Sequence, residues 1–374
     1  MQRKNLKVLK IAQICYSGLG GHSSVVFSLI SADKQKKNEW LIGFVGNECL
    51  SEHNASQCKK FGIANKTFDF NKGNRLQAWY RLFKWLKLSQ PSSVICHSST
   101  MILPCVIYSS LNSAKLICVE HTPNAKKTSR EWLFSFLSMF LCKQVIVLTP
   151  NYLEELKKAY GFLYISSKFS IVPNGIDTNI FFPDQKKLYH LQGAKEIKLG
   201  MAARFSEQKR QELLINTISY LKEHHAEYKI SFSFAGDGPT LQKCRSLVDQ
   251  KKINSLVEFT GFLKESELLE WFKTIDIYVH ATDGETLSTS LLQAMSLELP
   301  IIASDIPGVS NLLHQEESYG VTSYNTCRSF SEKIIELINS PEMLKSFRHQ
   351  ARLKVLRDYS NTEMLAKYIK TVSI

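Results

Sequence analysis

VHATDGETLSTSLLQAMSLELPIIASDIPG, residues Val279–Gly308, is the stretch that decides the fold. The apolar run Ile277–Ala281 predicts a short buried strand, and the polar TDGE that follows is typical of a turn. Apolar residues recur on one face of Thr286–Leu297, so we expect a helix there, followed by a strand that Pro300 opens. Strand, turn, helix and strand in this order indicate a parallel sheet covered by helices.

The predicted helix would direct its first turn beyond the end of the preceding strand. N–H groups in a first turn have no partner within the helix, and the helix dipole adds positive potential, so this turn can accept phosphate. The candidate ligands are Thr286, Leu287 and Ser288. On a helix, the spacing of Glu285 and Gln293 places them roughly 80 degrees apart around the axis and about 12 Å apart along it. That span suits a ligand with a sugar at one end, a ribose at the other and a diphosphate between them.

The segment ETLSTSLLQAMSLELPIIASDIPG resembles the signature of the family 4 retaining glycosyltransferases of the GT-B fold. In that family, two glutamates separated by seven residues precede an Ala-Met pair and a strand led by proline. Glu285 occupies the first glutamate position, whereas Gln293 stands at the second. The resemblance implies that Glu285 holds hydroxyls of the donor sugar. It also implies that Gln293 faces the ribose, where an amide can both donate and accept hydrogen bonds.

A second motif lies earlier, in MAARFSEQKRQELLINTI. It resembles the family's G-x-G/A-R-x-x-x-x-K phrase, whose arginine and lysine hold the donor diphosphate. Arg204 and Lys209 occupy those positions. Two fixed positive charges stabilise the charge that grows on the leaving diphosphate as the glycosidic bond breaks. An arginine and a lysine five residues apart are by themselves typical of a solvated surface, but two motifs in family order favour a site.

Length and charge suggest two domains of different character. The 374 residues, 44% of them hydrophobic, leave room for two domains of about 150 to 180 residues, which we expect at 1–178 and 179–374. Residues 1–178 carry 23 Lys and Arg against 10 Asp and Glu, whereas residues 179–374 carry 24 of each. The whole excess of +13 therefore lies in the N-terminal half.

The cysteines and the N-terminus predict a cytoplasmic protein. Nine cysteines are scattered singly without metal-ligand spacing, which indicates small core residues in a reducing compartment. Lys7 and Lys10 interrupt the first apolar run, so it is expected to be a strand and not a signal peptide. No apolar stretch approaches the roughly 18 residues that a spanning helix needs.

Two histidines in the N-terminal half follow predicted strands. SSVICHSS ends its strand at His97, and KLICVEHTPN ends its strand at His121, where a ligand-facing loop of a parallel sheet begins. A single histidine at such a position is more often structural. The resemblance implies that His121 lies against the donor sugar, and that Gly20 and Gly21 form a loop beside the donor phosphates or the acceptor. A plain glycine turn explains the two glycines equally well.

Other phrases of the family recur along the chain. Gly236 in AGDGP and Gly261 in FTGFL resemble turns that surround the nucleotide, although both also fit ordinary turns. VPNGID resembles the hinge between the domains, and Asp184–Glu196 is predicted to be a polar linker. In the GT-B fold the last helix returns to the first domain, so residues 361–374 are expected there.

Two amphipathic segments carry much of the basic charge. Asn74–Leu88 places Gln77, Arg81, Lys84 and Lys87 on one side of a helical wheel. The other side holds Leu76, Trp79, Leu82, Phe83 and Leu86, and Tyr80 and Trp85 lie at the margin of the basic side. Ala125–Lys143 has the same combination of basic and apolar residues, with Lys126, Lys127 and Arg130 ahead of an apolar run. Such segments either cover a sheet as surface helices or meet anionic lipid headgroups.

Together these features predict an α/β protein of GT-B type, with two Rossmann-like parallel-sheet domains facing a cleft. The resemblance implies a retaining glycosyltransferase that moves a sugar from a nucleotide diphosphate donor, a UDP-sugar rather than a GDP-sugar, to a lipid-linked saccharide, as in bacterial polysaccharide or lipopolysaccharide biosynthesis. It implies no cofactor and no metal, because Arg204, Lys209 and the helix N-terminus would take the place of a divalent cation. We expect peripheral binding to the inner face of an anionic membrane.

Three alternatives remain open. A GT-B sugar-nucleotide epimerase would share the diphosphate site but would need no acceptor. A non-catalytic subunit of a glycosyltransferase complex is suggested by Gln293, whereas Arg204, Lys209 and Glu285 argue against it. Nucleic-acid binding is not favoured, because the basic residues lie among amphipathic helices without a recognisable nucleic-acid module.

Overall fold

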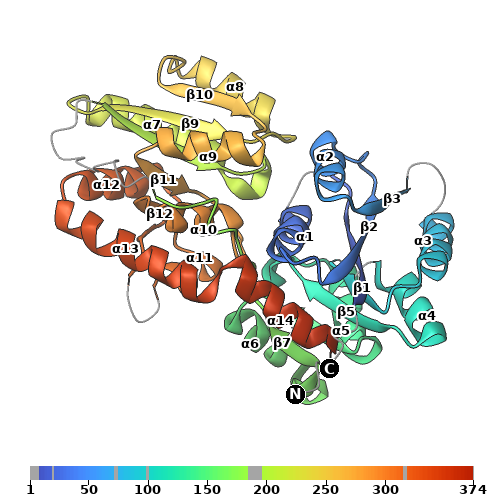
Figure 1. Ribbon diagram of the computed structural model, residues 1–374. Coiled ribbons are helices and arrows are strands. Elements are labelled where there is room, and N and C mark those ends of the chain that lie inside the picture. The colour runs from blue at the N-terminus through green and yellow to red at the C-terminus, as the bar shows by residue number, and fades with distance from the viewer. Residues whose placement is uncertain are drawn as a thin grey trace. The chain divides into compact units, whose positions relative to one another are not determined.

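The computed structural model describes residues 8–18, 21–70, 75–97, 101–183, 196–314 and 318–373. The chain divides into two compact units (Figure 1). Unit 1 comprises Met1–Asp177 together with Asn361–Ile374, and unit 2 comprises Thr178–Ser360. Two expectations fall on undescribed positions: Gly20, and the predicted linker apart from its last residue, Glu196.

Unit 1 is built on a seven-stranded parallel sheet in the order β3-β2-β1-β4-β5-β6-β7. The strands are β1 (Leu9–Tyr16), β2 (Asn38–Gly46), β3 (Ala64–Asp69), β4 (Ser93–Cys96), β5 (Lys115–Glu120), β6 (Gln144–Val147) and β7 (Phe169–Ile171). β1 and β4 are almost wholly buried, as expected for strands covered on both faces. Strand order reverses between β1 and β4, so the loops after these strands diverge there and leave room for a ligand.

Several helices of unit 1 begin after a residue whose side chain caps them. They are α1 (Gly21–Ala32), α2 (Glu52–Phe61), α3 (Arg75–Ser89), α4 (Ile102–Asn112), α5 (Ser129–Leu141), α6 (Pro150–Tyr160) and α14 (Asn361–Ser373). Thr149 accepts a hydrogen bond from the Tyr152 N–H at 3.2 Å and so caps α6. Thr128 and Glu131 form a capping box at α5.

The last helix belongs to unit 1, although it comes after all of unit 2 in the sequence. α14 packs against α1. The backbone N–H of Asn361 donates to the Ile176 carbonyl at 2.8 Å, and the Asn361 side chain donates to Ser31 Oγ at 3.2 Å. These bonds anchor the start of α14 to α1 and to the end of the N-terminal segment of unit 1.

Unit 2 is built on a six-stranded parallel sheet in the order β10-β9-β8-β11-β12-β13. The strands are β8 (Glu196–Ala202), β9 (Lys229–Ala235), β10 (Val257–Gly261), β11 (Ile277–His280), β12 (Ile301–Ser304) and β13 (Val321–Ser323). The helices are α7 (Gln211–His224), α8 (Leu241–Gln250), α9 (Glu265–Thr274), α10 (Thr289–Ser296), α11 (Pro307–Leu313), α12 (Cys327–Ile338) and α13 (Pro341–Asp358). The order reverses between β8 and β11, as it does between β1 and β4. Both units are therefore Rossmann-like, and the predicted α/β fold is confirmed.

Two details of the amphipathic segments differ from the prediction. Leu76 is 66% exposed and lies on the outer side of α3, because the buried stripe of this helix runs through Ala78, Leu82 and Leu86. Lys127 is not part of a basic surface. Its side chain is 1% exposed and its Nζ lies 3.0 Å from Glu120 Oε2, in a buried ion pair. Among the described helices, none is long and apolar enough to cross a bilayer.

Candidate active site

The two signature motifs meet at the carboxyl ends of β8 and β11, where the strand order of unit 2 reverses. Arg204 follows the end of β8 by two residues, and Lys209 closes a short 3-10 helix (Glu207–Lys209) that precedes α7. Glu285 lies in the loop after β11. In open α/β sheets this edge is where ligands bind.

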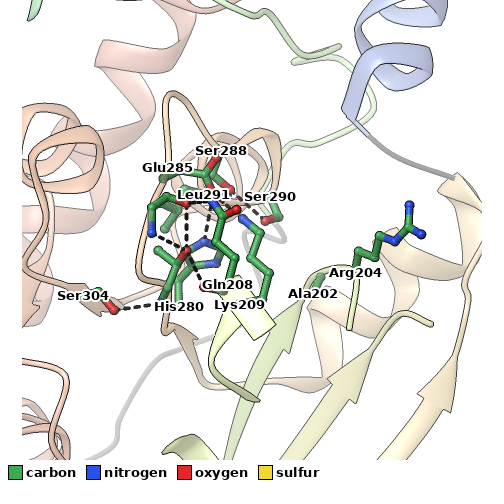
Figure 2. Close-up of polar contacts among 12 residues, drawn as sticks. Ala202, Arg204, Gln208, Lys209, His280, Glu285, Ser288, Ser290, Leu291 and Ser304 are labelled. Atoms are coloured by element: carbon green, nitrogen blue, oxygen red, sulfur yellow. Dashed lines mark hydrogen bonds and ion pairs between the residues drawn. The ribbon is translucent and has the colours of Figure 1, made fainter. Parts of the chain in front are cut away.

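Lys209 and Glu285 form an ion pair through Nζ and Oε2 (Figure 2). The two side chains are only 20% and 14% exposed. His280, the last residue of β11, places Nε2 3.4 Å from the same carboxylate oxygen. Burial opposes ionisation of Glu285, but the charge of Lys209 and the hydrogen bond with His280 outweigh burial and lower the pKa of Glu285 to about 2. Glu285 is therefore an anion at neutral pH.

His280 is held from the other side by Tyr278. The Tyr278 hydroxyl lies 3.3 Å from His280 Nδ1 and donates to the Ala202 carbonyl at 3.2 Å. Burial lowers the pKa of His280. The end of β11 thus links Glu285 to the end of β8 through a buried polar chain.

The loops after β8 and β11 are joined by Gln208. Its carbonyl accepts hydrogen bonds from the Asp283 N–H at 2.9 Å and from Thr282 Oγ1 at 3.1 Å, and its side-chain amide donates to the Gly284 carbonyl. Arg210 adds an ion pair with Asp283 at 2.9 Å. Consecutive residues on one loop therefore bind consecutive residues on the other, which fixes Lys209 against Glu285.

The helix after Glu285 begins later than predicted. α10 starts at Thr289, and Ser288 is its N-cap, with its side-chain oxygen accepting from the Leu291 N–H at 3.4 Å. Thr286, Leu287 and Ser288 therefore precede the helix instead of forming its first turn. Glu285 is outside the helix as well, so the expected helical spacing between Glu285 and Gln293 is wrong. Gln293 itself lies on α10 and is half-buried.

Arg204 is not part of the Lys209–Glu285 cluster. Its side chain is exposed and extends away from the cluster (Figure 2). Its backbone carbonyl accepts a hydrogen bond from the Gln211 side chain at 3.0 Å, which ties the loop to the first turn of α7.

Glycines let the backbone approach closely around this edge. A Cβ at Gly236, whose φ is +138°, would lie 2.0 Å from the Ala203 carbonyl oxygen. The Gly236 N–H donates to the Gly261 carbonyl at 2.8 Å, so the two predicted glycines are adjacent at the ends of β9 and β10. Gly308, at the start of α11, was not singled out from the sequence. A Cβ there would lie 1.7 Å from the Glu285 carbonyl oxygen, so only glycine leaves room for that loop.

In unit 1 the predicted histidines lie together after neighbouring strands. His97 follows β4, His121 follows β5, and His97 Nδ1 lies 2.9 Å from His121 Nε2. His22, near the start of α1, has its ring centroid 4.5 Å from that of His121. Burial lowers the pKa of His22 to about 4 and that of His97 to about 3, and burial also lowers the pKa of His121. Gly21 is exposed at the first position of α1.

The sequence did not single out His22, His280, Gln208 or Tyr278. The signal available for His280 was its position as the last residue of a strand, the same signal that pointed to His97 and His121. Within the described residues, no group of three or more His, Cys, Asp or Glu side chains is arranged to hold a metal ion.

Comparison with known families assigns both halves of the chain. Residues 186–354 match the family described as "Glycosyl transferases group 1", and residues 20–180 match "Glycosyltransferase Family 4".

Among curated proteins, the chain is 24% identical over 241 residues to an alpha-monoglucosyldiacylglycerol synthase of Acholeplasma laidlawii, covering 62% of this chain and 58% of the relative. It is 30% identical over 187 residues to the O-antigen biosynthesis glycosyltransferase WclY of Escherichia coli, covering 49% of this chain and 47% of that protein. The chain thus spans about half the length of these relatives.

Solved structures show the same fold over the whole chain. Anabaena HepE, crystallised with UDP and glucose, superimposes with a TM-score of 0.81 at 15% identity, covering 98% of this chain and 99% of HepE. The two Rossmann-like units, the paired motifs of unit 2 and the two family matches lead to one assignment: the chain belongs to the family 4 glycosyltransferases of the GT-B fold.

Proposed function

We propose that the protein transfers a sugar from a UDP-sugar to a saccharide acceptor with retention at the anomeric carbon, and without a metal or cofactor. The Lys209–Glu285 pair carries this proposal, because it brings together one residue from each family motif at the ligand-binding edge of a parallel sheet. The relatives in glycolipid and O-antigen synthesis, and the UDP and glucose bound to HepE, support the choice of donor and acceptor class.

In this proposal, different residues of unit 2 bind different parts of the donor. Lys209 and Arg204 bind the diphosphate and stabilise the charge that grows on it as the glycosidic bond breaks. The turn that precedes α10 contributes backbone N–H groups to the same phosphates. Glu285, ionised because of Lys209, accepts hydrogen bonds from hydroxyls of the donor sugar, and Gln293 binds the ribose.

No carboxylate of this site is assigned as a nucleophile. We propose that the leaving phosphate itself assists deprotonation of the acceptor on the same face of the sugar. We assign His121, which is half-buried and kept neutral by desolvation that lowers its pKa, to the donor sugar as a hydrogen-bonding group.

Ligand binding and turnover test the proposal separately. In a thermal-shift experiment, UDP and UDP-sugars should raise the melting temperature more than GDP or ADP, because a ligand that binds only the folded state stabilises it. Incubation with a UDP-sugar and a lipid-linked saccharide should yield a glycosylated product, whereas donor alone should not be converted to another sugar nucleotide. Conversion without acceptor would identify an epimerase, and tight UDP binding without either reaction would identify a non-catalytic subunit.

We also propose that unit 1 binds anionic membranes, beside a lipid-linked acceptor. Neighbouring helices α3, α4 and α5 carry large apolar and basic side chains that point to solvent, which we call the α3–α5 surface. Its members are Leu76, Tyr80, Lys84, Lys87, Leu88, Ile107, Leu111, Arg130, Leu133, Phe140 and Leu141. Unit 1 has 25 Lys and Arg against 11 Asp and Glu, whereas unit 2 has 22 against 23. An apolar surface within a basic unit suits anionic headgroups and the acyl chains below them.

Charge reversal on this surface tests membrane binding. Each basic residue near an anionic bilayer contributes about 1 kcal/mol, so Lys84→Glu with Lys87→Glu should weaken co-sedimentation with phosphatidylglycerol vesicles by at least tenfold. The matched control, Lys222→Glu with Lys243→Glu, reverses two exposed lysines of unit 2 and should leave vesicle binding unchanged. Equal binding to phosphatidylcholine alone would show that the basic residues of the α3–α5 surface have no part in membrane binding, and equal loss in the control would show that the effect is not specific to this surface.

A further inference from the structure

A chain of hydrogen-bonding side chains runs from the interior of the unit 1 sheet to its ligand-binding edge. Gln13 lies in β1 and is 0% exposed, and His97, after β4, is 1% exposed. Gln13 Oε1 lies 2.7 Å from His97 Nε2, and His97 Nδ1 lies 2.9 Å from His121 Nε2. His121 is partly exposed, so the chain ends where a ligand can reach it.

The first member of this chain determines where the protons lie. An amide oxygen can only accept, so His97 must donate its Nε2–H to Gln13. The burial that lowers the pKa of both histidines keeps their rings neutral at pH 7, and a neutral imidazole carries one proton. His97 Nδ1 is therefore an acceptor, and His121 donates its Nε2–H to it.

We propose that Gln13 and His97 are positioning residues that hold His121 in one ring orientation and in the tautomer protonated at Nε2. Nδ1 then carries no proton, so in any contact with a hydroxyl of a sugar it can act only as an acceptor. The identity of the ligand rests on the proposed function, whereas the tautomer rests only on contacts within unit 1.

His22 lies beside His121, the last member of this series of hydrogen-bonded side chains. Its ring lies against His121, with centroids 4.5 Å apart, and its buried Nδ1 has no hydrogen-bond partner among the described residues. A buried polar atom without a partner is uncommon in a folded protein. A polyhydroxylated ligand beside His121 would supply that partner.

Nitrogen NMR of the protein labelled at histidine tests the tautomer directly. The signals of His121 are assigned by their loss in His121→Gln. In the wild-type protein at pH 7, we expect Nε2 to be protonated and Nδ1 to be unprotonated. Protonation at Nδ1 would mean that the Gln13 amide nitrogen faces His97, and it would overturn the proposal.

Substitutions show whether Gln13 and His97 set the tautomer of His121 or only fill space in the sheet. His97→Phe and Gln13→Met should each produce a mixture of His121 tautomers and lower kcat/KM by roughly 10- to 100-fold, the range known for partners that orient metal-bound histidines. His97→Asn places an amide oxygen near the former Nδ1, so it should restore the Nε2-protonated tautomer and much of the activity. Cys96→Ala alters the buried residue beside His97 but leaves the hydrogen bonds between Gln13, His97 and His121 in place. It should therefore leave the His121 tautomer unchanged.

The His121 tautomer and the transfer activity test two different claims. An unchanged His121 tautomer in His97→Phe, in folded protein, would overturn the positioning role. Absence of sugar transfer by the wild-type protein, with the tautomers as expected, would overturn the proposed function and leave the positioning role standing.

Discussion

The two sheets of the molecule reverse their strand order in the same way, but the polar residues at the two reversals differ in charge. At the edge of unit 1, three histidines are neutral because burial disfavours their cationic forms. At the edge of unit 2, a lysine and a glutamate of low exposure both stay charged, because each compensates the other. The same backbone topology therefore supports a neutral hydrogen-bonding site in one unit and a charged site in the other.

This difference suits the two chemical groups of the proposed donor. A leaving diphosphate needs fixed charge, whereas sugar hydroxyls need donors and acceptors that do not attract phosphate. We therefore expect charge-neutralising substitutions to be most damaging in unit 2, and substitutions that change hydrogen bonding to be most damaging in unit 1.

The largest expected effect is the loss of Lys209. Lys209→Met removes a diphosphate ligand and leaves Glu285, 14% exposed, without its cation. We expect kcat/KM to fall by about 30- to 1000-fold, which corresponds to about 2 to 4 kcal/mol of transition-state stabilisation. Arg204→Ala should fall within the same range, with less effect on the Glu285 region because Arg204 points away from it.

Steady-state kinetics on folded variants measures this, with Lys273→Ala, an exposed lysine of α9, as the control. Wild-type kinetics in both Lys209→Met and Arg204→Ala would show that neither residue stabilises the transition state, and the charged cluster of unit 2 would then have no part in the reaction.

Gln293 is expected to contribute less than Lys209, because it is uncharged. If Gln293 binds the ribose, Gln293→Leu leaves hydroxyls without a partner at a cost of about 1 to 3 kcal/mol. Gln293→Glu keeps an acceptor and should retain or tighten donor binding. Calorimetric titration with UDP and a UDP-sugar measures all three proteins. The same affinity in each would place this residue outside the donor site and favour the non-catalytic alternative.

The sequence motifs identified more residues of the charged cluster in unit 2 than of the neutral cluster in unit 1. The motif residues Lys209 and Glu285 are paired in the structure, since two motifs fix these residue types close to the ends of β8 and β11, which are neighbours in the sheet. His22 and Gln13 went unrecognised, because their meeting with His121 depends on long-range strand order. The start of α10 was misplaced, because apolar periodicity does not distinguish a residue in the helix from one in the loop ahead of Ser288.

A third prediction concerns the free energy of unfolding at acid pH, because buried neutral histidines make it depend on pH. His97 has a folded-state pKa of about 3 against a usual 6.5, so unfolding takes up a proton below pH 6.5. Its contribution is fully present above pH 6.5 and is lost as pH falls towards 3. Between pH 7 and pH 5 the loss from this group is about 2 kcal/mol.

Urea unfolding followed by tryptophan fluorescence measures this loss mainly in unit 1, which holds four of the five tryptophans. His97→Phe should be less acid-sensitive than the wild-type protein over this range. Glu285 in unit 2 also has a lowered pKa, but its contribution is lost only as pH falls from 4.5 towards 2, so it does not interfere. An equal pH slope in wild-type and His97→Phe proteins would show that His97 is not held neutral.

The smallest expected effect compares two helix caps, one in each unit. Ser288 caps α10 and Thr149 caps α6, each through a side-chain oxygen that accepts a hydrogen bond from the backbone N–H three residues later. Loss of such a cap costs about 1 kcal/mol, so Ser288→Ala and Thr149→Ala should lower stability by similar amounts in urea unfolding. Only Ser288 lies in the turn assigned to the donor phosphates, so only Ser288→Ala should also weaken UDP binding in calorimetry. If both variants weakened UDP binding equally, the effect would come from general loss of stability, and the turn before α10 would have no particular part in holding the diphosphate.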